Sequence, residues 1–553
     1  DSAEREFRGF GKVEQWDTES LGTYEATGRG AEAALDLDPV RTVSWFHTGA
    51  WRQQGTLESA YEAEYWSEDE ADWPTENAKE DAPVSGASWP AWKVAERWEA
   101  ARALKGKLLR QELYAEDGSE SASLPYAVTA TTWTVARLQP LGSSEHACFT
   151  TIARESLARH YERVTADPRS THELTLSYDS YGTVTKKASV GYPRRDVEDR
   201  REEQNALTVM IAESTSVNDD SSMDTETDPA AMHWHVGVAT RSTGWHLTNT
   251  AWQASGSWNY TDLARFSATI LTAALDAATE IPFEQSAASG AEKRAISIEA
   301  TLYWKDDLSG PADVGTMESR ALPCQVYRKT VTTGLASDIF PSVPDNAAFE
   351  AAGYVELEED GDWWVASGTA TPDPAKFYQA TELTDPFGNS TTLSYDAWSL
   401  FVLSATDALG NSIIVAMDPA ALQPSAVTDA NGNITEARYD ALGRVIAVAV
   451  EGDVLETAPT VATSYELGRW AASALPARTV TTQRTEHGGS EFLYRYSYSD
   501  GGGKLVQEKV SAEDGEVPGE TGTISPRWVG TGRTVLNNKE LPVKQYEPFF
   551  SAT

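Results

Sequence analysis

The sequence predicts an all-β protein in which antiparallel β-hairpins follow one another along the chain, with a few helical insertions. Short segments rich in Val, Thr, Tyr and Trp alternate with Gly, Asp, Asn and Pro over most of the 553 residues, a pattern typical of strands joined by turns. A 22-residue spacing also repeats within 385–450. The form Tyr-Asp-x-x-Gly-x-Val occurs at both 178–184 and 439–445. Together these observations indicate a long ribbon of hairpins.

Composition and charge exclude several classes of protein. The chain carries 84 acidic and 45 basic side chains, a formal charge of −39. Such a surface repels nucleic-acid phosphates and anionic lipid headgroups, so we expect no nucleic-acid partner and no direct membrane insertion. Hydrophobic residues make up 40% of the chain, too many for a disordered segment. No apolar run approaches the roughly 18–20 residues of a membrane helix, and a soluble, folded protein is expected.

The cysteines and the first residue give two further expectations. Cys148 and Cys324 are the only cysteines, which excludes a disulfide framework and favours two reduced, buried thiols. The chain begins at Asp1 without a recognisable signal peptide, and we expect it to be a piece of a longer polypeptide.

Three segments interrupt the strand pattern. Apolar residues recur every three or four positions from Ala91 to Arg110 and predict an amphipathic helix of about four turns. Residues 58–88 are acidic and rich in Trp without clear periodicity, and an irregular excursion is expected there. Residues 218–228 read NDDSSMDTETD. They lack the Gly and the distal Glu of a calcium loop, which favours a solvated connection over a cation site.

The strongest signal is the repeat within 385–450. Its candidate site residues are the turn positions of four units, which in chain order are Asp385, Gly388, Asn389, Asp407, Gly410, Asn411, Asp429, Gly432, Asn433, Tyr439, Asp440 and Gly443. A second acidic row keeps the same period at Asp396, Asp418 and Asp440.

Each unit has the chemistry of a turn. The Asp carboxylate can accept hydrogen bonds from backbone N–H groups two or three residues later, and Gly adopts the positive φ that closes the turn. Two turns and two strands in 22 residues form one hairpin. Because a lone hairpin is marginally stable in water, successive hairpins must share a continuous sheet.

Residues for catalysis or metal binding are weakly indicated. His233 and His235 would lie on one face of a strand and could supply two metal ligands. Spacing does not identify a third ligand such as His246 or Asp228, so packing is favoured and no metal or cofactor is expected. No phosphate-binding loop, nucleophile elbow or Cys–His pair is evident. The sequence therefore predicts a protein that is not an enzyme.

Longer motifs resemble a known family. Tyr-Asp-x-x-Gly-Arg units are typical of YD, or RHS, repeats. The longer segments resemble the B component of bacterial Tc insecticidal toxin complexes, and they lie at 5–15, 44–49, 102–114, 160–163, 191–195, 527–530 and 543–550.

The resemblance implies a spiral of hairpins that forms a shell wall. In that family, the B component and a C component, an RHS protein with a toxic C-terminal cargo, form a hollow shell that passes the cargo to an A-component channel. We therefore expect a secreted structural component, with the C component as direct partner and the channel as indirect partner. The alternatives are an extracellular YD-repeat glycan-binding or adhesion module and a polysaccharide-active β-solenoid.

The resemblance also suggests three regions and raises the question of a cleavage site. The expected regions are an N-terminal part at 1–120, degenerate hairpins at 121–380, and regular repeats with a closing segment at 381–553. In the C component an Asp-Pro-x-Gly motif marks a self-cleavage site, and residues 385–388 have this form. Because Asp407 and Asp429 occupy the same register without Pro, we expect residues 385–388 to form a repeat turn.

Overall fold

The computed structural model describes residues 6–18, 35–50, 54–67, 73, 92–142, 144–194, 201–219, 233–252, 265–288, 290–450 and 452–553. The chain divides into two compact units. Unit 1 comprises 1–18 and 38–367, and unit 2 comprises 19–37 and 368–553.

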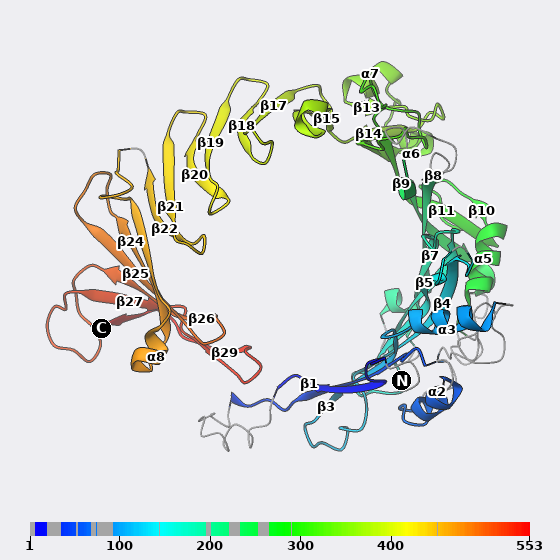
Figure 1. Ribbon diagram of the computed structural model, residues 1–553, viewed down its shortest axis with the longest axis horizontal. Coiled ribbons are helices and arrows are strands. Elements are labelled where there is room, and N and C mark those ends of the chain that lie inside the picture. The colour runs from blue at the N-terminus through cyan, green and yellow to red at the C-terminus, as the bar shows by residue number, and fades with distance from the viewer. Residues whose placement is uncertain are drawn as a thin grey trace. The chain divides into compact units, whose positions relative to one another are not determined.

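Unit 1 is built on one 14-stranded sheet in which the strands follow chain order, apart from β10 and the exchanged β13 and β14 at one edge (Figure 1). In sheet order its strands are β1 (Lys12–Trp16), β2 (Val40–Phe46), β3 (Leu108–Ala115), β4 (Ala127–Gln139), β5 (Cys148–His160), β6 (Arg169–Tyr178), β7 (Val184–Gly191), β8 (Thr208–Asp219), β9 (His235–Asn249), β11 (Ala291–Tyr303), β12 (Pro323–Val331), β14 (Trp363–Ala366) and β13 (Tyr354–Val355). The short β10 (Thr279–Glu280) pairs in parallel with β11.

Helical insertions cover part of this sheet. The helices of unit 1 are α2 (Gln54–Glu62), α3 (Val94–Ala103), α5 (Ala268–Ala277), α6 (Thr333–Ile339) and α7 (Asn346–Ala351), with short 3-10 turns η5 (Glu202–Asn205) and η6 (Thr250–Trp252). Helix α3 packs on β4 and β5, and α5 packs on β6 and β11. The largest apolar core lies beneath α5, where Leu271 and Leu275 meet Leu157, Leu174 and Ile211.

Unit 2 is a second 14-stranded sheet in strict chain order until its last strand. Its strands are β15 (Thr369–Asp373), β16 (Gln379–Thr384), β17 (Ser390–Tyr395), β18 (Val402–Thr406), β19 (Ser412–Asp418), β20 (Gln423–Thr428), β21 (Ile434–Tyr439), β22 (Val445–Val450), β23 (Val461–Glu466), β24 (Ala477–Arg484), β25 (Phe492–Ser499), β26 (Leu505–Ala512), β27 (Arg527–Thr531) and β30 (Phe549–Ser551). A separate hairpin joins β28 (Thr534–Leu536) to β29 (Pro542–Gln545), and the helical pieces are η7 (Pro374–Lys376) and α8 (Arg469–Ser473).

The sheet of unit 2 is a single layer in the part of the chain that the structure describes. Its buried hydrophobic side chains, apart from Pro372, are Ala447, Ala449 and Val517. Cross-strand register places Leu393, Ala405 and Ile413 on one face and the threonines that alternate with them on the other. One face is therefore apolar and remains partly exposed, as Ile413 shows at 49%.

The predicted all-β fold of antiparallel hairpins with a few helical insertions is confirmed. The helix predicted over 91–110 is shorter, because α3 ends at Ala103 and Gly106 turns the chain at φ 76°. Leu108 then enters β3, which pairs with β2 and β4 on its two sides. Cross-strand pairing overrides the local helical spacing there.

Other expectations have mixed outcomes. Part of the irregular excursion at 58–88 is helical, since α2 runs to Glu62, and residues 68–72 and 74–88 lie outside the described residues. Of the acidic segment 218–228, Asn218 and Asp219 end β8, and the remainder lies outside the described residues.

Both cysteines are free thiols; Cys324 is buried as expected, but Cys148 is exposed. Among the described helices, none has the length and apolar character needed to cross a membrane.

Candidate functional site: the repeat turns

The three turns that begin at Asp385, Asp407 and Asp429 share one set of hydrogen bonds. In the first, Asp385 Oδ1 accepts from Phe387 N at 2.9 Å and from Asn389 N at 2.8 Å, and Oδ2 accepts from Asn389 Nδ2 at 2.8 Å. The turns at Asp407 and Asp429 repeat this pattern. The donors are therefore two and four residues after the Asp, where sequence reasoning gave two or three.

Backbone geometry explains the glycine of each turn. Gly388 N donates to Asp385 O at 3.0 Å, and Asp385 N donates back to Asn389 O at 2.9 Å. Gly388, Gly410 and Gly432 have φ of 85°, 88° and 85°, a left-handed conformation that costs other residues energy. A Cβ on any of these glycines would meet no atom within 4 Å. The requirement for glycine is therefore conformational and not steric.

Hydrogen bonding keeps these carboxylates ionised. The side chain and backbone of Asn389 hold the pKa of Asp385 below its ordinary value of 3.8. Asn411 and Asn433 lower the pKa of Asp407 and Asp429 in the same way. A carboxylate that accepts several N–H groups favours its charged form. The ionised carboxylates thus serve as hydrogen-bond acceptors within their own turns.

The second acidic row closes the hairpins at the opposite ends of the strands. Asp396 Oδ1 accepts from Leu400 N and Phe401 N, and Asp418 Oδ1 accepts from Ala420 N. The residue with left-handed φ is Ser399 (φ 56°) in the first turn and Gly443 in the third, each bonded through its N–H to the carbonyl of the turn Asp, and in the one-residue-longer second turn it is Leu422 (φ 54°). Because two of these residues are not glycine, the sequence signal of this row was weaker.

Tyrosine hydroxyls connect neighbouring strands with the same period. Tyr395 donates to Ala380 O at 2.7 Å, and Tyr439 donates to Pro424 O at 2.6 Å. Met417 occupies the intervening position and has no hydroxyl to donate. The aromatic position of the repeat therefore stabilises strand pairing in alternate units.

The same turn recurs outside the regular repeat. Asp179 Oδ1 accepts from Tyr181 N and Thr183 N, and Gly182 has φ 86°. Asp500 Oδ1 accepts from Gly502 N and Lys504 N. Asn537 makes the equivalent bonds with Lys539 N and Leu541 N, with Glu540 at φ 58°. Sequence reasoning missed the turn at Asn537, because it carries neither Asp nor Gly.

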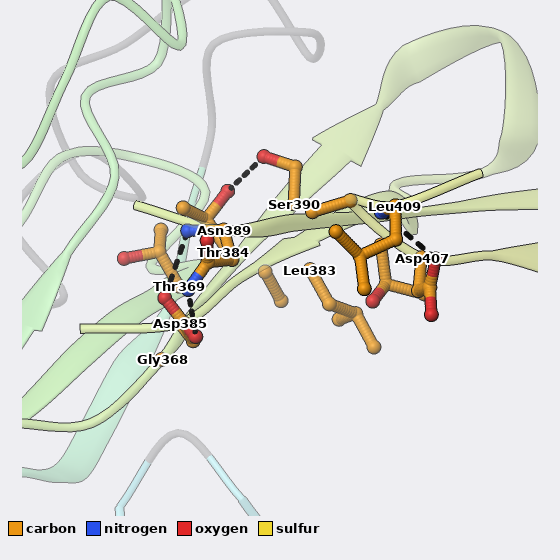
Figure 2. Close-up of a pocket in the computed structure, with 12 residues that line it drawn as sticks. Gly368, Thr369, Leu383, Thr384, Asp385, Asn389, Ser390, Asp407 and Leu409 are labelled. Carbon is orange, nitrogen blue, oxygen red and sulfur yellow. Dashed lines mark hydrogen bonds between the residues drawn. The ribbon is translucent and has the colours of Figure 1, made fainter. Parts of the chain in front are cut away.

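An open pocket of about 710 Å³ lies between the hairpins whose turns begin at Asp385 and Asp407. Figure 2 shows Leu383 and Leu409 beside it. Thr384 Oγ1 and Ser390 Oγ bond each other at 3.2 Å, so both hydroxyls are occupied. Leu409 is 89% exposed. The polar groups here are already engaged in hydrogen bonds within the turns, and Leu409 is exposed. This arrangement favours contact with another protein surface over catalysis.

Unit 1 contains a buried polar network that the sequence did not indicate. Phe266 N donates to the Tyr192 hydroxyl at 3.1 Å, and that hydroxyl lies 3.0 Å from His172 Nδ1. His172 Nε2 lies 3.2 Å from Glu155 Oε2, and Arg265 donates to both oxygens of Glu155. Because the ionised Glu155 can only accept, Nε2 carries the imidazole hydrogen, and Nδ1 of the neutral ring accepts from the Tyr192 hydroxyl.

The charges in this network follow from burial and bonding. Burial lowers the pKa of His172, which favours a neutral ring. Burial opposes the ionisation of Glu155, but His172 and Arg265 hold its pKa at about 2. A carboxylate and a guanidinium therefore form the ion pair, and the neutral histidine donates to it. His172 is fully buried, so this arrangement stabilises the sheet.

The candidate metal-binding histidines, His233 and His235, each have a hydrogen-bond partner within the chain. The rings of His233 and His235 are 5.2 Å apart, but His235 Nε2 is 2.8 Å from Ser319 O. His233 Nε2 is 3.2 Å from Asp219 Oδ2. Within the described residues no group of three metal-ligating side chains gathers.

The fold and the turns define a class of protein built from sheets of consecutive antiparallel hairpins closed by Asp or Asn turns. Residues 99–237 match the family described as the insecticide toxin TcdB middle/C-terminal region. This match confirms over those residues the resemblance to the Tc toxin B component that the motifs indicated. No curated protein matches the sequence.

Solved structures extend the likeness of fold to the whole chain. The crystal structure of TcdB2–TccC3 is similar with a TM-score of 0.77 and 23% identity, covering 100% of this chain and 28% of that chain. The structure of TcdB2–TccC3–Cdc42 is similar with a TM-score of 0.74 and 22% identity, covering 100% of this chain and 30% of that chain. The structure of a Tc holotoxin pore of Photorhabdus luminescens is similar with a TM-score of 0.75 and 22% identity, covering 99% of this chain and 29% of that chain. The chain thus has the fold found in these toxins and spans less than a third of the chains it matches.

Proposed function

We propose that this chain forms part of the wall of a shell that encloses a toxic polypeptide in a Tc-type toxin complex. The supporting observation is the single-layer sheet of unit 2, in which consecutive hairpins pair without a covering layer in the described residues. A globular domain buries its apolar sheet face against a second layer. A wall separates two spaces and can expose both faces.

Confinement, and not catalysis, is the proposed mechanism. Strands paired on both sides have no free edges through which another chain could insert or a protease could bind. The partner we propose is an RHS-type C component that carries the cargo, with an A-component channel as an indirect partner. The complex would act outside the producing cell, and the net charge of −39 would favour the solubility of so large a particle.

Protease protection tests this proposal. The full-length protein that contains this chain is assembled with a C component that bears a cargo, and trypsin digestion of the cargo is followed over time. The cargo should persist far longer in the complex than when free. Equal digestion of enclosed and free cargo would overturn the proposal. A glycan array run in parallel reports on the adhesion alternative, which binding there would support.

Turn variants connect the protection to this chain. The triple variant Gly388→Val, Gly410→Val, Gly432→Val should open the wall, because a β-branched residue resists the left-handed φ of these turns. The cargo should then be digested faster. Gly501→Val is the matched control, because a Cβ there meets no atom within 4 Å and its φ lies outside the left-handed region.

A further inference from the structure

A groove of about 650 Å³ lies in unit 1 where β11 and β12 separate. The ladder between these strands ends at the pair Glu299–Arg328. Beyond it β11 continues along β9, with Ala295 opposite Trp245, while β12 continues along β14. Two strand segments thus face each other across the groove, each paired on its far side and with no ladder between them.

Neighbouring elements close the ends of the groove. Ile281 N donates to Lys293 O at 2.9 Å, and Gln285 N donates to Pro282 O at 3.1 Å, so a tight turn follows β10 at one end. The first turn of α6 lies at this same end, where Thr332 Oγ1 donates to Glu284 Oε2 at 3.1 Å, and the ladder pair Glu299–Arg328 closes the other end. The volume falls within the range of about 300–1,000 Å³ typical of ligand sites. Phe283 and Ile296 line it and are 44% and 39% exposed.

The groove is acidic. Lys329 lies 2.6 Å from Asp360, 3.1 Å from Asp362 and 3.5 Å from Glu358, so its charge is more than balanced. Three further cations lie near the groove: Arg241 pairs with Glu358, Arg294 donates to the carbonyls of Phe283 and Gln285, and Lys293, opposite Glu280 in the strand pair, lies over the ring of Trp245.

Two further carboxylates, Glu280 and Glu284, line the groove. Among the described residues neither has a cation within 4.0 Å. Glu284 Oε2 accepts from Thr332 Oγ1 at 3.1 Å. Acidic groups therefore outnumber cations around the groove, and the carboxylates without a cation lie on its β10 side.

We propose that this groove binds a short, extended, basic segment of a partner polypeptide, which pairs as a strand with residues 294–298 of β11, between β10 and the end of the β12 ladder. Strand addition supplies main-chain hydrogen bonds, while pockets for alternate side chains supply specificity. Apolar side chains of the segment pack on Ile296 and Phe283, and its Lys or Arg side chains reach Glu280 and Glu284. The inference does not depend on the proposed shell function.

Fluorescence anisotropy with a labelled peptide of alternating Lys and Val, capped at both ends, tests the inference on the full chain. Two comparison peptides carry Glu in place of Lys, or N-methyl groups at alternate backbone nitrogens. The Lys peptide should bind at least tenfold more tightly than either. Equal binding of the N-methylated peptide would overturn strand addition, because that peptide keeps the charge and loses the main-chain donors.

Charge reversal separates the groove from the general negative surface. The double variant E280K/E284K should weaken binding of the Lys peptide at least tenfold and improve binding of the Glu peptide. The matched control E382K/E436K makes the same charge change on β16 and β21 of unit 2 and should leave binding nearly unchanged. An equal loss in both variants would show non-specific attraction to the acidic protein and overturn the site.

Discussion

At the scale of single residues, glycine in the repeat turns acts through its backbone alone. Gly410 has φ 88° and open space around it, so Gly410→Ala should destabilise the turn by about 1 kcal/mol through left-handed strain. Hydrogen exchange measured by mass spectrometry should show faster exchange in β18 and β19. Gly501→Ala lacks this strain, and an equal effect there would contradict the argument.

The buried histidine gives a residue-scale prediction about pH. Because folding lowers the pKa of His172 from 6.5, the unfolded chain binds the proton more readily. The stabilisation by the neutral ring is complete above pH 6.5 and is lost as the pH falls from there toward the folded pKa. Urea denaturation of unit 1 should therefore show lower stability at pH 5.5 than at pH 7.5.

The variant His172→Gln isolates this contribution. Its amide can donate to Glu155 and accept from Tyr192 but cannot titrate in this range, so the difference between the two pH values should shrink. His160→Gln removes an exposed histidine at the end of β5. If that control reduced the pH dependence equally, the buried network would not be its source.

At the scale of elements, strand pairing in the repeat depends partly on side-chain hydroxyls. Tyr439→Phe should lower the unfolding free energy of unit 2 by about 1 kcal/mol, because it removes one hydrogen bond to Pro424 O on the neighbouring strand. Tyr395→Phe should lower the unfolding free energy by a similar amount, because it removes the hydrogen bond to Ala380 O. Thermal denaturation measures both. Tyr494→Phe, on β25 and 40% exposed, is the control and should change little.

The predictability of each element depends on how local its determinants are. The turn at Asp407 needs only the next four residues, so its Asp, Gly and Asn could be recognised by spacing alone. The end of α3 could not be recognised in this way, because Leu108 belongs to β3, whose position depends on pairing with β2 and β4. The same holds for Glu155, whose partners His172 and Arg265 lie 17 and 110 residues away. Such contacts exist only after the sheet has formed.

At the scale of the whole molecule, apolar burial is unequally distributed between the two units. Every buried hydrophobic cluster among the described residues belongs to unit 1, including those around Leu157, Trp45 and Trp364. Unit 2 is held by backbone ladders, turn carboxylates and cross-strand hydroxyls. Because burial supplies most of the free energy that favours folding, strands of unit 2 should open at lower cost.

Hydrogen exchange of the full chain measures this difference. Amides of β4 to β8 should exchange more slowly than those of β16 to β21, since opening free energies rise with buried apolar contact. Within unit 2, β22 should be the most protected strand, because Ala447 and Ala449 lie buried there. Uniform protection across both sheets would mean that hairpin pairing alone supports unit 2 as firmly as a covered core. In that case a single layer of paired hairpins would be sufficient to make a rigid sheet.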